Sequence, residues 1–382
     1  MRTMLTTVTN RALTRTHDGL QIRRTVDRIP METSGFRRVL RVGICGTDLQ
    51  IQRGARDDRA AVLGHEGIAE RLDGPSDASG SCEIFNPVDP DDQDVILGHS
   101  VDGLLRDYIV GEIDSLRSVV PACSSLPLDL APLVEPTATC LYAWELMRPQ
   151  LGKGAPVAIF GAGSSALLLA MLGEDLGHRV YLVHPRSQRL RFIAQLGVLR
   201  TACLATSVPV DSMQAAVTCL PREAAQHAIE QATESLIDGG IINLFGGIPT
   251  SFQSPMIPHV DLSTVRRANI CGRTRGSAHL EAVAATGKRV RLTGHRGTSP
   301  AHLHEAQRHL VDGASRYGRL ITQVISLDEA AVRVPSMAGR RRIHGEHVKV
   351  VVDLTMACWT RSVDLYNTVA EHLALGGLDA VH

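Results

Sequence analysis

Several features that mark other protein classes are missing from this sequence of 382 residues. No stretch approaches about eighteen uninterrupted apolar residues, so no membrane-spanning helix is expected. Forty basic and forty acidic residues leave no formal net charge, which gives no electrostatic reason to expect nucleic acid or an anionic membrane as a partner. The amino-terminal segment lacks the apolar run of a secretory signal, and we therefore expect a cytoplasmic protein.

The eight cysteines also lack a pattern that would pair them. They are scattered singly, and no Cys-x-x-Cys occurs anywhere. In a chain of this length, such a distribution indicates reduced thiols, of which one or two could serve chemistry. What remains is an ordinary soluble globular composition. The length exceeds what one hydrophobic core usually organises, so two domains are expected.

Local patterns divide the chain into two kinds of region. Up to about residue 140 and again beyond 320, short apolar runs broken by glycine, proline and aspartate are typical of β-strands, beginning with a pair at 4–9 and 20–25. In between, strand and helix patterns alternate, as in a parallel sheet covered by helices on both faces. We therefore predict an α/β domain over 146–316, inserted in a mainly β domain formed by 1–145 and 317–382.

The α/β region supports this prediction element by element. Its expected strands and helices are 156–160, 165–176, 179–183, 188–196, 201–205, 214–220, 223–236 and 241–245. The last helix is expected to end at Gly239 and Gly240. Residues 272–282 and 294–306 share the order Gly, Arg, Gly, Ala-His-Leu and Glu-Ala, which favours a short tandem duplication, with chance similarity as the alternative.

A glycine-rich turn follows the first strand of the α/β region. Phe160 precedes Gly-Ala-Gly-Ser-Ser-Ala, a G-x-G-x-x-A pattern in the strand–turn–helix context that dinucleotide binding requires. Gly161 would permit the tight turn, and Gly163 would let the backbone approach a pyrophosphate. Ala166 would allow close packing of helix on strand. The amides at the helix N-terminus would then face the phosphates. An ordinary glycine-rich loop is the alternative.

The end of the second strand bears on the choice of nicotinamide cofactor. His184 and Arg186 follow this strand, Arg189 lies one turn further on, and no acid is present to bind the ribose 2′-hydroxyl of NAD. A carboxylate there would repel a 2′-phosphate, so its absence beside basic side chains favours NADP, with NAD as the alternative. We expect these three residues to contact the cofactor, unless the two arginines are solvent-exposed charges at a helix start.

The first region contains residues with the chemistry of zinc ligands. Cys45 and His65 each lie at a strand end, twenty positions apart, and offer a thiolate and an imidazole. Glu66 could be a third ligand or lie one water away. Glu135 adds a carboxylate where a helix begins, with Cys140 as its rival. Three ligands and one open position describe a catalytic zinc. Singly, each residue has a structural alternative, as a core cysteine, a loop histidine or a helix cap.

In combination, these motifs resemble the zinc-dependent medium-chain dehydrogenases and reductases, the family of alcohol and polyol dehydrogenases. The likeness rests on Gly-Ile-Cys-Gly-Thr-Asp at 43–48, Gly-His-Glu at 64–66, Glu-Pro at 135–136 and the turn at 161–166, and it covers about 30–355. It implies a GroES-like catalytic domain clasping a Rossmann domain. It also implies hydride transfer between NADP or NAD and a small alcohol or carbonyl compound, in a homodimer or homotetramer.

The resemblance implies roles for single residues. Cys45 and His65 would bind one catalytic zinc, with Glu135 in the third position as in the sorbitol dehydrogenase branch. Glu66 would be a ligand or an exchanging ligand. Thr47 would pass on the hydroxyl proton of the substrate.

Two departures from the family pattern matter. Relatives with a second, structural zinc carry four closely spaced cysteines after the Gly-His-Glu motif, whereas 74–103 contains Cys82 alone, so we predict no structural zinc. Gln50 stands where a histidine often extends the proton relay, so water or another group must complete it. Asn-Pro at 86–87 and Asp-Gly-x-x-x-Asp-Tyr at 102–108 are similar to the polyol branch that includes the ribulose-5-phosphate reductases.

The expected substrate is a polyol, a sugar or a cyclitol, on this resemblance alone. A basic stretch raises the hypothesis of a phosphate on the substrate, with a solvated or interface segment as the alternative: Arg273, Arg275, Lys288, Arg289 and Arg291. Two other functions stay open, a zinc-free quinone or enoyl reductase of the same family and a non-catalytic NADP(H)-binding protein. After residue 353, Trp359 and an amphipathic run over 363–375 predict a packing or interface helix.

Overall fold

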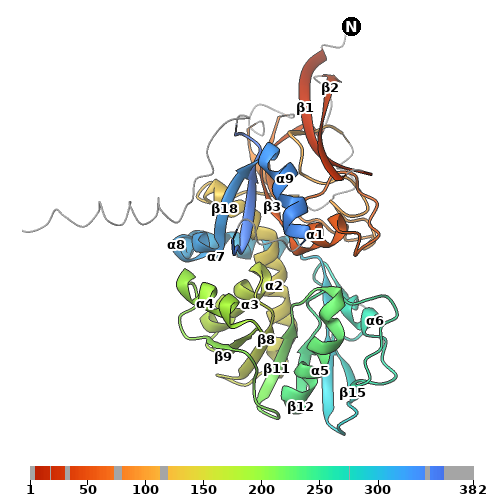
Figure 1. The fold of residues 1–382 in the computed structure, drawn as a ribbon, viewed down its shortest axis with the longest axis vertical. Helices are drawn as coiled ribbons and strands as arrows, with labels where there is room; N and C mark the ends of the chain where they lie inside the picture. The colour runs from red at the N-terminus through yellow and green to blue at the C-terminus, as the bar shows by residue number, and fades with distance from the viewer. Residues whose placement is uncertain are drawn as a thin grey trace, which may run out of the picture.

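The computed structural model describes residues 5–17, 19–30, 35–72, 80–111, 119–274, 276–339 and 345–356. Within these ranges the chain builds two seven-stranded sheets, a two-stranded hairpin and a three-stranded sheet. The two large sheets lie in the upper and lower halves of the molecule in Figure 1, with helix α2 (Val134–Met147) between them. Arg275, Trp359 and the helix expected over 363–375 lie outside the described residues.

The upper sheet joins strands from both ends of the chain. Its order is β18-β19-β3-β4-β5-β7, and β6 also pairs with β3. The strands are β3 (Arg37–Ile44), β4 (Glu66–Arg71), β5 (Cys82–Phe85), β6 (Tyr108–Ile109), β7 (Val119–Pro121), β18 (Ile321–Ser326) and β19 (Lys349–Asp353). Strand β19 runs antiparallel to β3, so a strand formed late in the chain supports the strand that leads into Cys45.

The amino-terminal strands form a long hairpin. Strands β1 (Leu5–Thr16) and β2 (Gly19–Pro30) are antiparallel and continuous in register, which extends the shorter pair expected from the sequence. The hairpin projects at the top of Figure 1, and its Leu13 and Leu20 are buried in the core of the upper sheet.

The lower sheet is the doubly wound parallel sheet that the sequence predicted. Its order is β10-β9-β8-β11-β12-β16-β15, and only β15 is antiparallel to its neighbour among these strands. The strands are β8 (Pro156–Phe160), β9 (Arg179–Val183), β10 (Cys203–Ala205), β11 (Met213–Thr218), β12 (Leu236–Asn243), β15 (Leu280–Val283) and β16 (Arg289–Thr293). The order reverses between β8 and β11, which is where such sheets bind ligands at their carboxyl edge.

Helices cover both faces of this sheet because the strand residues alternate between two cores. Val157 and Ile159 of β8 pack in one core with helix α3 (Ser164–Asp175), and Ala158 and Phe160 pack in the other with helix α5 (Ala225–Ser235). The remaining helices are α1 (Gly46–Gln52), α4 (Ser187–Leu196), α6 (Leu262–Arg266), α7 (Pro300–Asp312), α8 (Ala314–Tyr317) and α9 (Leu327–Ala338). Short 3₁₀ segments are Leu128–Leu133, Arg148–Gln150, Arg222–Ala224 and Gly318–Leu320.

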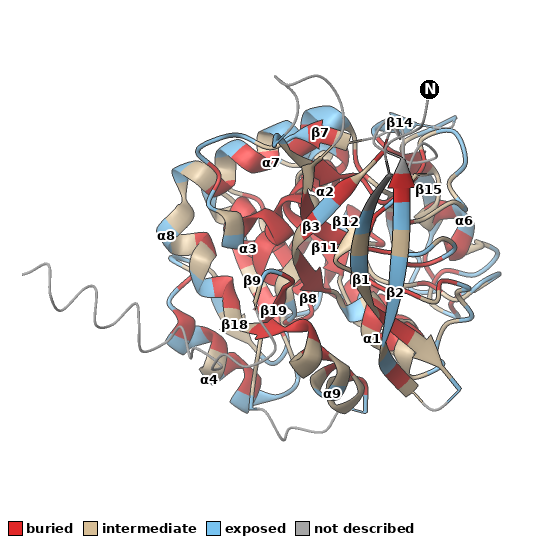
Figure 2. Cartoon of the chain, turned by 90° about the horizontal axis from the view of Figure 1, so that it is seen from above, coloured by how far each residue is buried: buried red, intermediate tan, exposed pale blue. Residues whose placement is uncertain are grey.

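Helix α2 ties the two halves together. It packs against α3 and α7, and the surrounding core cluster also contains Ile68 of β4 and Ile84 of β5. Figure 2 shows α2 and α3 as mostly buried at the centre of the molecule. The indole of Trp144 donates to the carbonyl of Leu169 at 3.1 Å. The first turn of α2, which contains Glu135, is therefore fixed relative to both sheets.

Several sequence expectations differ from the structure. Strand β12 already begins at Leu236 and passes through the two glycines that were expected only to end a helix. Helix α9 was not expected, although Ser326 and Glu329 form the capping box that such a helix start requires. In the apolar run over 104–110, which has the pattern of the short β-strands expected in this region, only Tyr108–Ile109 is a strand.

The suspected duplication is not a structural repeat. Residues 272–282 contain β14 (Arg273–Thr274) and part of β15, whereas 294–306 contain β17 (His295–Arg296) and the start of α7. Ser299 caps α7 and Pro300 occupies its first turn. This helix-start proline occurs in 294–306 and has no counterpart in 272–282, so only the second segment begins a helix. The three-stranded sheet of β14, β13 (Asn269–Ile270) and β17 lies in this region. No helix in the described part of the chain combines the length and apolarity needed to cross a membrane.

Candidate metal centre

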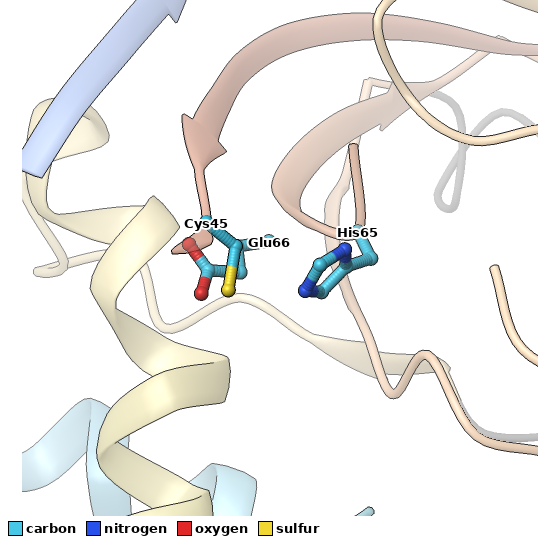
Figure 3. A group of neighbouring side chains, drawn as sticks. All are labelled: Cys45, His65 and Glu66. Atoms are coloured by element: carbon cyan, nitrogen blue, oxygen red, sulfur yellow. The ribbon is translucent and has the colours of Figure 1, made fainter. Parts of the chain in front are cut away.

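Cys45, His65 and Glu66 lie together at one end of the upper sheet (Figure 3). One ligand atom from each lies within 4.8 Å of the other two. Cys45 ends β3 and caps α1, and His65 and Glu66 open the neighbouring strand β4, so antiparallel pairing of these strands assembles the group. A thiolate, an imidazole and a carboxylate are donors that suit zinc. The residues present therefore fit the ion that the sequence predicted.

Asp48 organises two of these candidate ligands. Its fully buried carboxylate accepts the backbone N–H of Cys45 at 2.8 Å and that of Gly64 at 3.2 Å, and one oxygen lies 3.6 Å from Nδ1 of His65. Burial is the largest single influence on the pKa of His65 and lowers it, but the charge and hydrogen bonding of Asp48, together with those of Cys45, outweigh burial and leave this pKa well above its ordinary value. A bound metal would replace the proton on the imidazole, while Asp48 would keep the ring oriented.

Asp48→Asn is expected to weaken zinc binding by about 10- to 100-fold, because the amide keeps the shape but loses the charge that orients His65. Competition with a chromophoric chelator measures the affinity. The control is Asp129→Asn, which alters a half-exposed carboxylate paired with Arg41 at the surface and should leave the affinity unchanged. Equal zinc affinities of the wild type and the two variants would show that Asp48 does not support zinc binding.

A buried lysine holds the third candidate ligand. Lys349 of β19 forms an ion pair with Glu66, and both side chains are almost completely inaccessible to solvent. Burial is the largest single influence on the pKa of Lys349 and lowers it, but the interactions with Glu66, Cys45 and Glu135 together outweigh burial and raise this pKa overall. A Cβ on Gly43 would lie 2.8 Å from the carboxylate of Glu66, so glycine makes room for the pair. Glu66 thus has a buried cationic partner beside Cys45 and His65.

Glu135 and its rival Cys140 point to different neighbours. Burial and then the charge of Glu66 raise the pKa of Glu135 to about 7, so the carboxyl group of Glu135 lies near Glu66. Glu135 is not a member of the group formed by Cys45, His65 and Glu66. Thr139 donates to its carboxylate at 3.0 Å. The thiol of Cys140 donates to the carbonyl of Ser165 at 3.5 Å, and burial raises its pKa well above the ordinary value. Of the two, Glu135 has the more suitable surroundings for a metal ligand.

The two relay positions lie on α1. Thr47 is half-buried in its first turn, directly after Cys45. Gln50 is buried, its amide nitrogen lies 3.4 Å from the carbonyl of Gly46, and its amide oxygen has no hydrogen-bond partner among the described residues. His99, which the sequence did not single out, lies edge-on to His65 with ring centroids 4.9 Å apart. Burial, and then the charge of His65, lowers the pKa of His99 well below its ordinary value.

The glycine turn has the geometry expected for a dinucleotide. Gly161 has φ of 141°, and a Cβ there would collide with the carbonyl of Cys219. Gly163 caps α3 in an extended conformation, and no atom lies within 4 Å of where its Cβ would be. Ala166 is completely buried on the first turn of α3. The backbone at Gly163 therefore faces open space at the carboxyl edge of β8.

The basic residues after β9 are bound to the protein itself. Arg189 is buried and donates through Nε and Nη2 to the carbonyl of Ala162 at 3.0 and 2.7 Å. Its Nη1 lies 2.7 Å from Glu346, and Nη1 of Arg186 lies 3.4 Å from the same carboxylate. Nδ1 of His184 accepts the backbone N–H of Arg186 at 3.1 Å. Arg189 thus braces the glycine turn. The residues directly after β9 include no acid, but Glu346, which is distant in the sequence, places a carboxylate beside these arginines.

The basic stretch proposed to bind a substrate phosphate does not gather at the site. Lys288 pairs with Asp211 and Arg289 pairs with Asp238, and β16 begins at Arg289, so these residues lie at the amino edge of the lower sheet. Ligands bind such sheets at the opposite, carboxyl edge. Arg273 is exposed, and its nearest carboxylate is 3.9 Å away. The solvated alternative describes Arg273 and Arg289, whereas Lys288 is largely buried and donates to the carbonyls of Glu234 and Leu236.

Solved structures share this fold over nearly their whole length. The L-idonate 5-dehydrogenase of Escherichia coli matches with a TM-score of 0.67 and 15% identity, covering 92% of this chain and 99% of that one. The 2R,3R-butanediol dehydrogenase of Bacillus subtilis matches with a TM-score of 0.65 and 18% identity, covering 90% and 99%. A Sinorhizobium meliloti protein described as a zinc-binding dehydrogenase and bound to NADP gives 0.65 and 19%, covering 91% and 99%.

The chain therefore has the fold of the medium-chain alcohol and polyol dehydrogenases, which confirms the Rossmann and GroES-like architecture implied by its motifs. Among curated proteins, the 2-dehydro-3-deoxy-L-galactonate 5-dehydrogenase of Pseudoalteromonas atlantica is 27% identical over 178 residues, which cover 41% of this chain. The match spans about half of that relative, 51% of its length. No protein-family model matches the chain.

Proposed function

We propose that the protein is a zinc-dependent oxidoreductase that transfers a hydride between NADP or NAD and an alcohol or carbonyl group of a polyol, sugar or cyclitol. The group formed by Cys45, His65 and Glu66 carries the proposal, because its three donor types match a catalytic zinc. The glycine turn at the switch point of the lower sheet supplies the matching dinucleotide site. Neighbours of the same fold that act on polyols and sugar acids support the reaction type.

Different residues of the chain would bind the metal, move the proton and hold the cofactor around the substrate oxygen. Cys45 and His65 would hold zinc, with Glu135 as the third ligand and Glu66 as an exchanging one. Bound zinc supplies Lewis-acid polarisation of an alcohol or carbonyl oxygen. The hydroxyl of Thr47 would carry the substrate's proton away from the site, and Gln50 beside it cannot titrate. The amides at the start of α3 would hold the cofactor phosphates so that the nicotinamide reaches the same oxygen-bearing carbon.

The proposed cofactor is NADP, with NAD as the alternative. Arg186 remains nearly half-exposed after β9 and is available to a 2′-phosphate, which supports NADP. Glu346 opposes this preference by placing a carboxylate 3.4 Å from the same guanidinium. His184 would lie beside the adenosine end of the cofactor, and Arg189 would act by bracing the turn.

The proposed division of the chain is a catalytic domain of 1–145 and 317–382 around a dinucleotide-binding domain of 146–316. Strands β18 and β19 support it, since they complete the sheet of the amino-terminal strands.

We also propose a cytoplasmic homodimer or homotetramer. The free thiols of the seven described cysteines fit a reducing compartment.

Gly163→Ala is expected to lower affinity for NADPH by at least about tenfold while leaving the melting temperature unchanged. The added methyl meets no protein atom within 4 Å, so only a bound pyrophosphate would feel it. Fluorescence titration with NADPH and a thermal melt measure the two properties. The contrasting variant Gly161→Ala should lower the melting temperature because of its φ of 141°. Unchanged affinity in the Gly163 variant would place the cofactor elsewhere.

The direct test is an assay of the zinc-loaded protein with neutral polyols, sugars, sugar acids and sugar phosphates against both cofactors. We expect NADPH to form from at least one class and to stop forming after a chelator removes the metal. Full activity without metal would indicate a zinc-free quinone or enoyl reductase instead. Cofactor binding without turnover of any compound, in either direction, would indicate a non-catalytic binding protein.

A further inference from the structure

Four arginines from separate segments converge next to the metal centre. They are Arg56 in the loop after α1, Arg222 at the start of the 3₁₀ segment after β11, Arg266 at the end of α6 and Arg296 in β17. After burial, the charges of Arg56 and Arg296 are the next positive contributions that lower the pKa of both Arg222 and Arg266. Arg56 and Arg296 are therefore close enough to each other and to both remaining arginines for their charges to repel.

The cluster begins one side chain away from the candidate ligands. Nη2 of Arg56 lies 3.5 Å from Nδ1 of His99, and the ring of His99 contacts the ring of His65. Arg296 reaches the same loop, with Nη1 3.3 Å from the carbonyl of Gln93. Arg56 and Arg296 thus border the loop that carries His99.

Carboxylates neutralise only part of this charge. Asp58 accepts two hydrogen bonds from Arg56, at 2.7 and 3.1 Å, and Asp94 lies 3.2 Å from Arg296. In the described ranges, no carboxylate lies within ion-pair distance of the other two guanidinium groups. Arg266 donates through Nε and Nη2 to the carbonyls of Gly246 and Phe245 at 3.0 and 2.9 Å, whereas its buried Nη1 and the buried Nε of Arg222 lack a hydrogen-bond partner among the described residues. Burying two such charges is costly unless a ligand satisfies them.

There is space for a ligand at this place. A cavity of about 720 Å³ opens between the two halves of the molecule, lined by Arg53, Ala55, Arg222, Glu223, Pro249, Thr250, Ala338 and Gly339. Arg222 is the member of the cluster that lines it, and Glu223 is paired with Arg53. It brings together the loop after α1 and the loops at the carboxyl edges of β11 and β12. Guanidinium groups bind carboxylate and phosphate oxygens in bidentate fashion, and converging positive charge raises the local concentration of anions.

We propose that this arginine cluster binds a carboxylate or phosphate group of the substrate whose alcohol carbon reacts at the metal centre. The substrate is then a sugar acid or a sugar phosphate and not a neutral polyol. This inference rests on the proposed function, and it assigns recognition of the anion to Arg56 and Arg296 in place of the basic stretch on β16. The pyrophosphate of the cofactor shares this chemistry and is the competing source, because Arg222 follows β11, next to the strand that leads into the glycine turn.

The test compares Arg56→Gln and Arg296→Gln with the wild type and with the control Arg289→Gln, whose side chain is exposed and distant from the site. For gluconate, ribitol 5-phosphate and neutral ribitol, kcat/KM is measured, and NADPH affinity is measured by fluorescence. We expect the wild type to prefer one of the anionic compounds. Each cluster variant should lose about 10- to 100-fold on that compound and less than about threefold on ribitol, with NADPH affinity unchanged.

A second measurement separates this inference from the proposed function. Calorimetric titration of the protein with gluconate and with inorganic phosphate needs no turnover. Binding to the wild type and the control that disappears in the cluster variants supports the anion site, even if no compound is oxidised. Zinc-dependent turnover without anion preference or binding overturns the site and leaves the function standing. Variants that weaken NADPH as much as the anionic substrate assign the cluster to the cofactor and overturn the inference.

Discussion

Replacing Cys45 by serine is expected to remove zinc from the protein and to lower turnover by about a thousandfold or more. The thiolate is the donor in the group that most favours zinc over harder cations, and a serine hydroxyl does not ionise near neutral pH. Losing a Lewis acid that contributes about 4 kcal/mol to the transition state corresponds to about three orders of magnitude in rate. The measurements are metal content by atomic emission and kcat/KM on the best substrate.

A matched control comes from the other cysteine near the centre. Cys140→Ser should retain zinc and most of the activity, because the thiol of Cys140 donates to the carbonyl of Ser165 and lies outside the ligand group. NADPH should bind both variants as it binds the wild type, since the glycine turn is unchanged. Zinc lost from the Cys140 variant but kept by the Cys45 variant would reverse the assignment of the thiolate ligand.

The second large effect concerns the buried ion pair. Lys349→Met is expected to lower the free energy of unfolding by about 3–5 kcal/mol, because it leaves the carboxylate of Glu66 buried without its partner. The double variant Lys349→Met with Glu66→Gln removes the charge as well as the partner and should recover most of this loss. Urea unfolding of metal-free protein measures these differences without any contribution from bound zinc.

The control for this prediction is the ion pair of Lys288 with Asp211, which reaches the surface. Lys288→Met removes the contact with Asp211, whose side chain is mostly exposed, and two hydrogen bonds to the carbonyls of Glu234 and Leu236. It should cost less than Lys349→Met, because it leaves no buried charge without its partner. If Lys349→Met cost no more than this control, the pair at Glu66 would be solvated, and the stabilisation assigned to its burial would be wrong.

The parts of the molecule that follow from the sequence are those whose signals are local. The turn at 161–166 lies in the strand–turn–helix context that gives it meaning, and β8, α3, β9 and α4 follow closely the residues expected from their periodicity. Cys45 and His65 could be proposed because each was expected next to a strand end and has ligand chemistry; in the structure Cys45 follows β3 and His65 precedes β4. Whether they meet depends on the pairing of β3 with β4, which the structure provides.

What the sequence did not reveal depends on contacts between distant segments. Lys349 is a single basic residue at the start of an apolar run of valines. A lysine in such a run indicates that its charge has a buried partner, but nothing in the neighbouring sequence identifies Glu66 as this partner. Glu346 reaches Arg186 across the molecule, which no inspection of the residues after β9 could show. The four arginines are likewise separated along the chain, and only the fold brings them together. Asp48 had a readable signal, since it stands three positions after Cys45 at a helix start, where acceptors cap backbone amides.

The place of β19 in the upper sheet has a consequence for biosynthesis. Strand β3 pairs with a strand that leaves the ribosome only after the whole α/β region has been made. During that interval the α/β region can fold, while Glu66 has no ammonium beside it and the ligand-bearing strands lack one neighbour. If the protein binds zinc as proposed, the ligand-bearing strands would reach their final arrangement only after β19 has been made, and metal binding would then follow the synthesis of that strand.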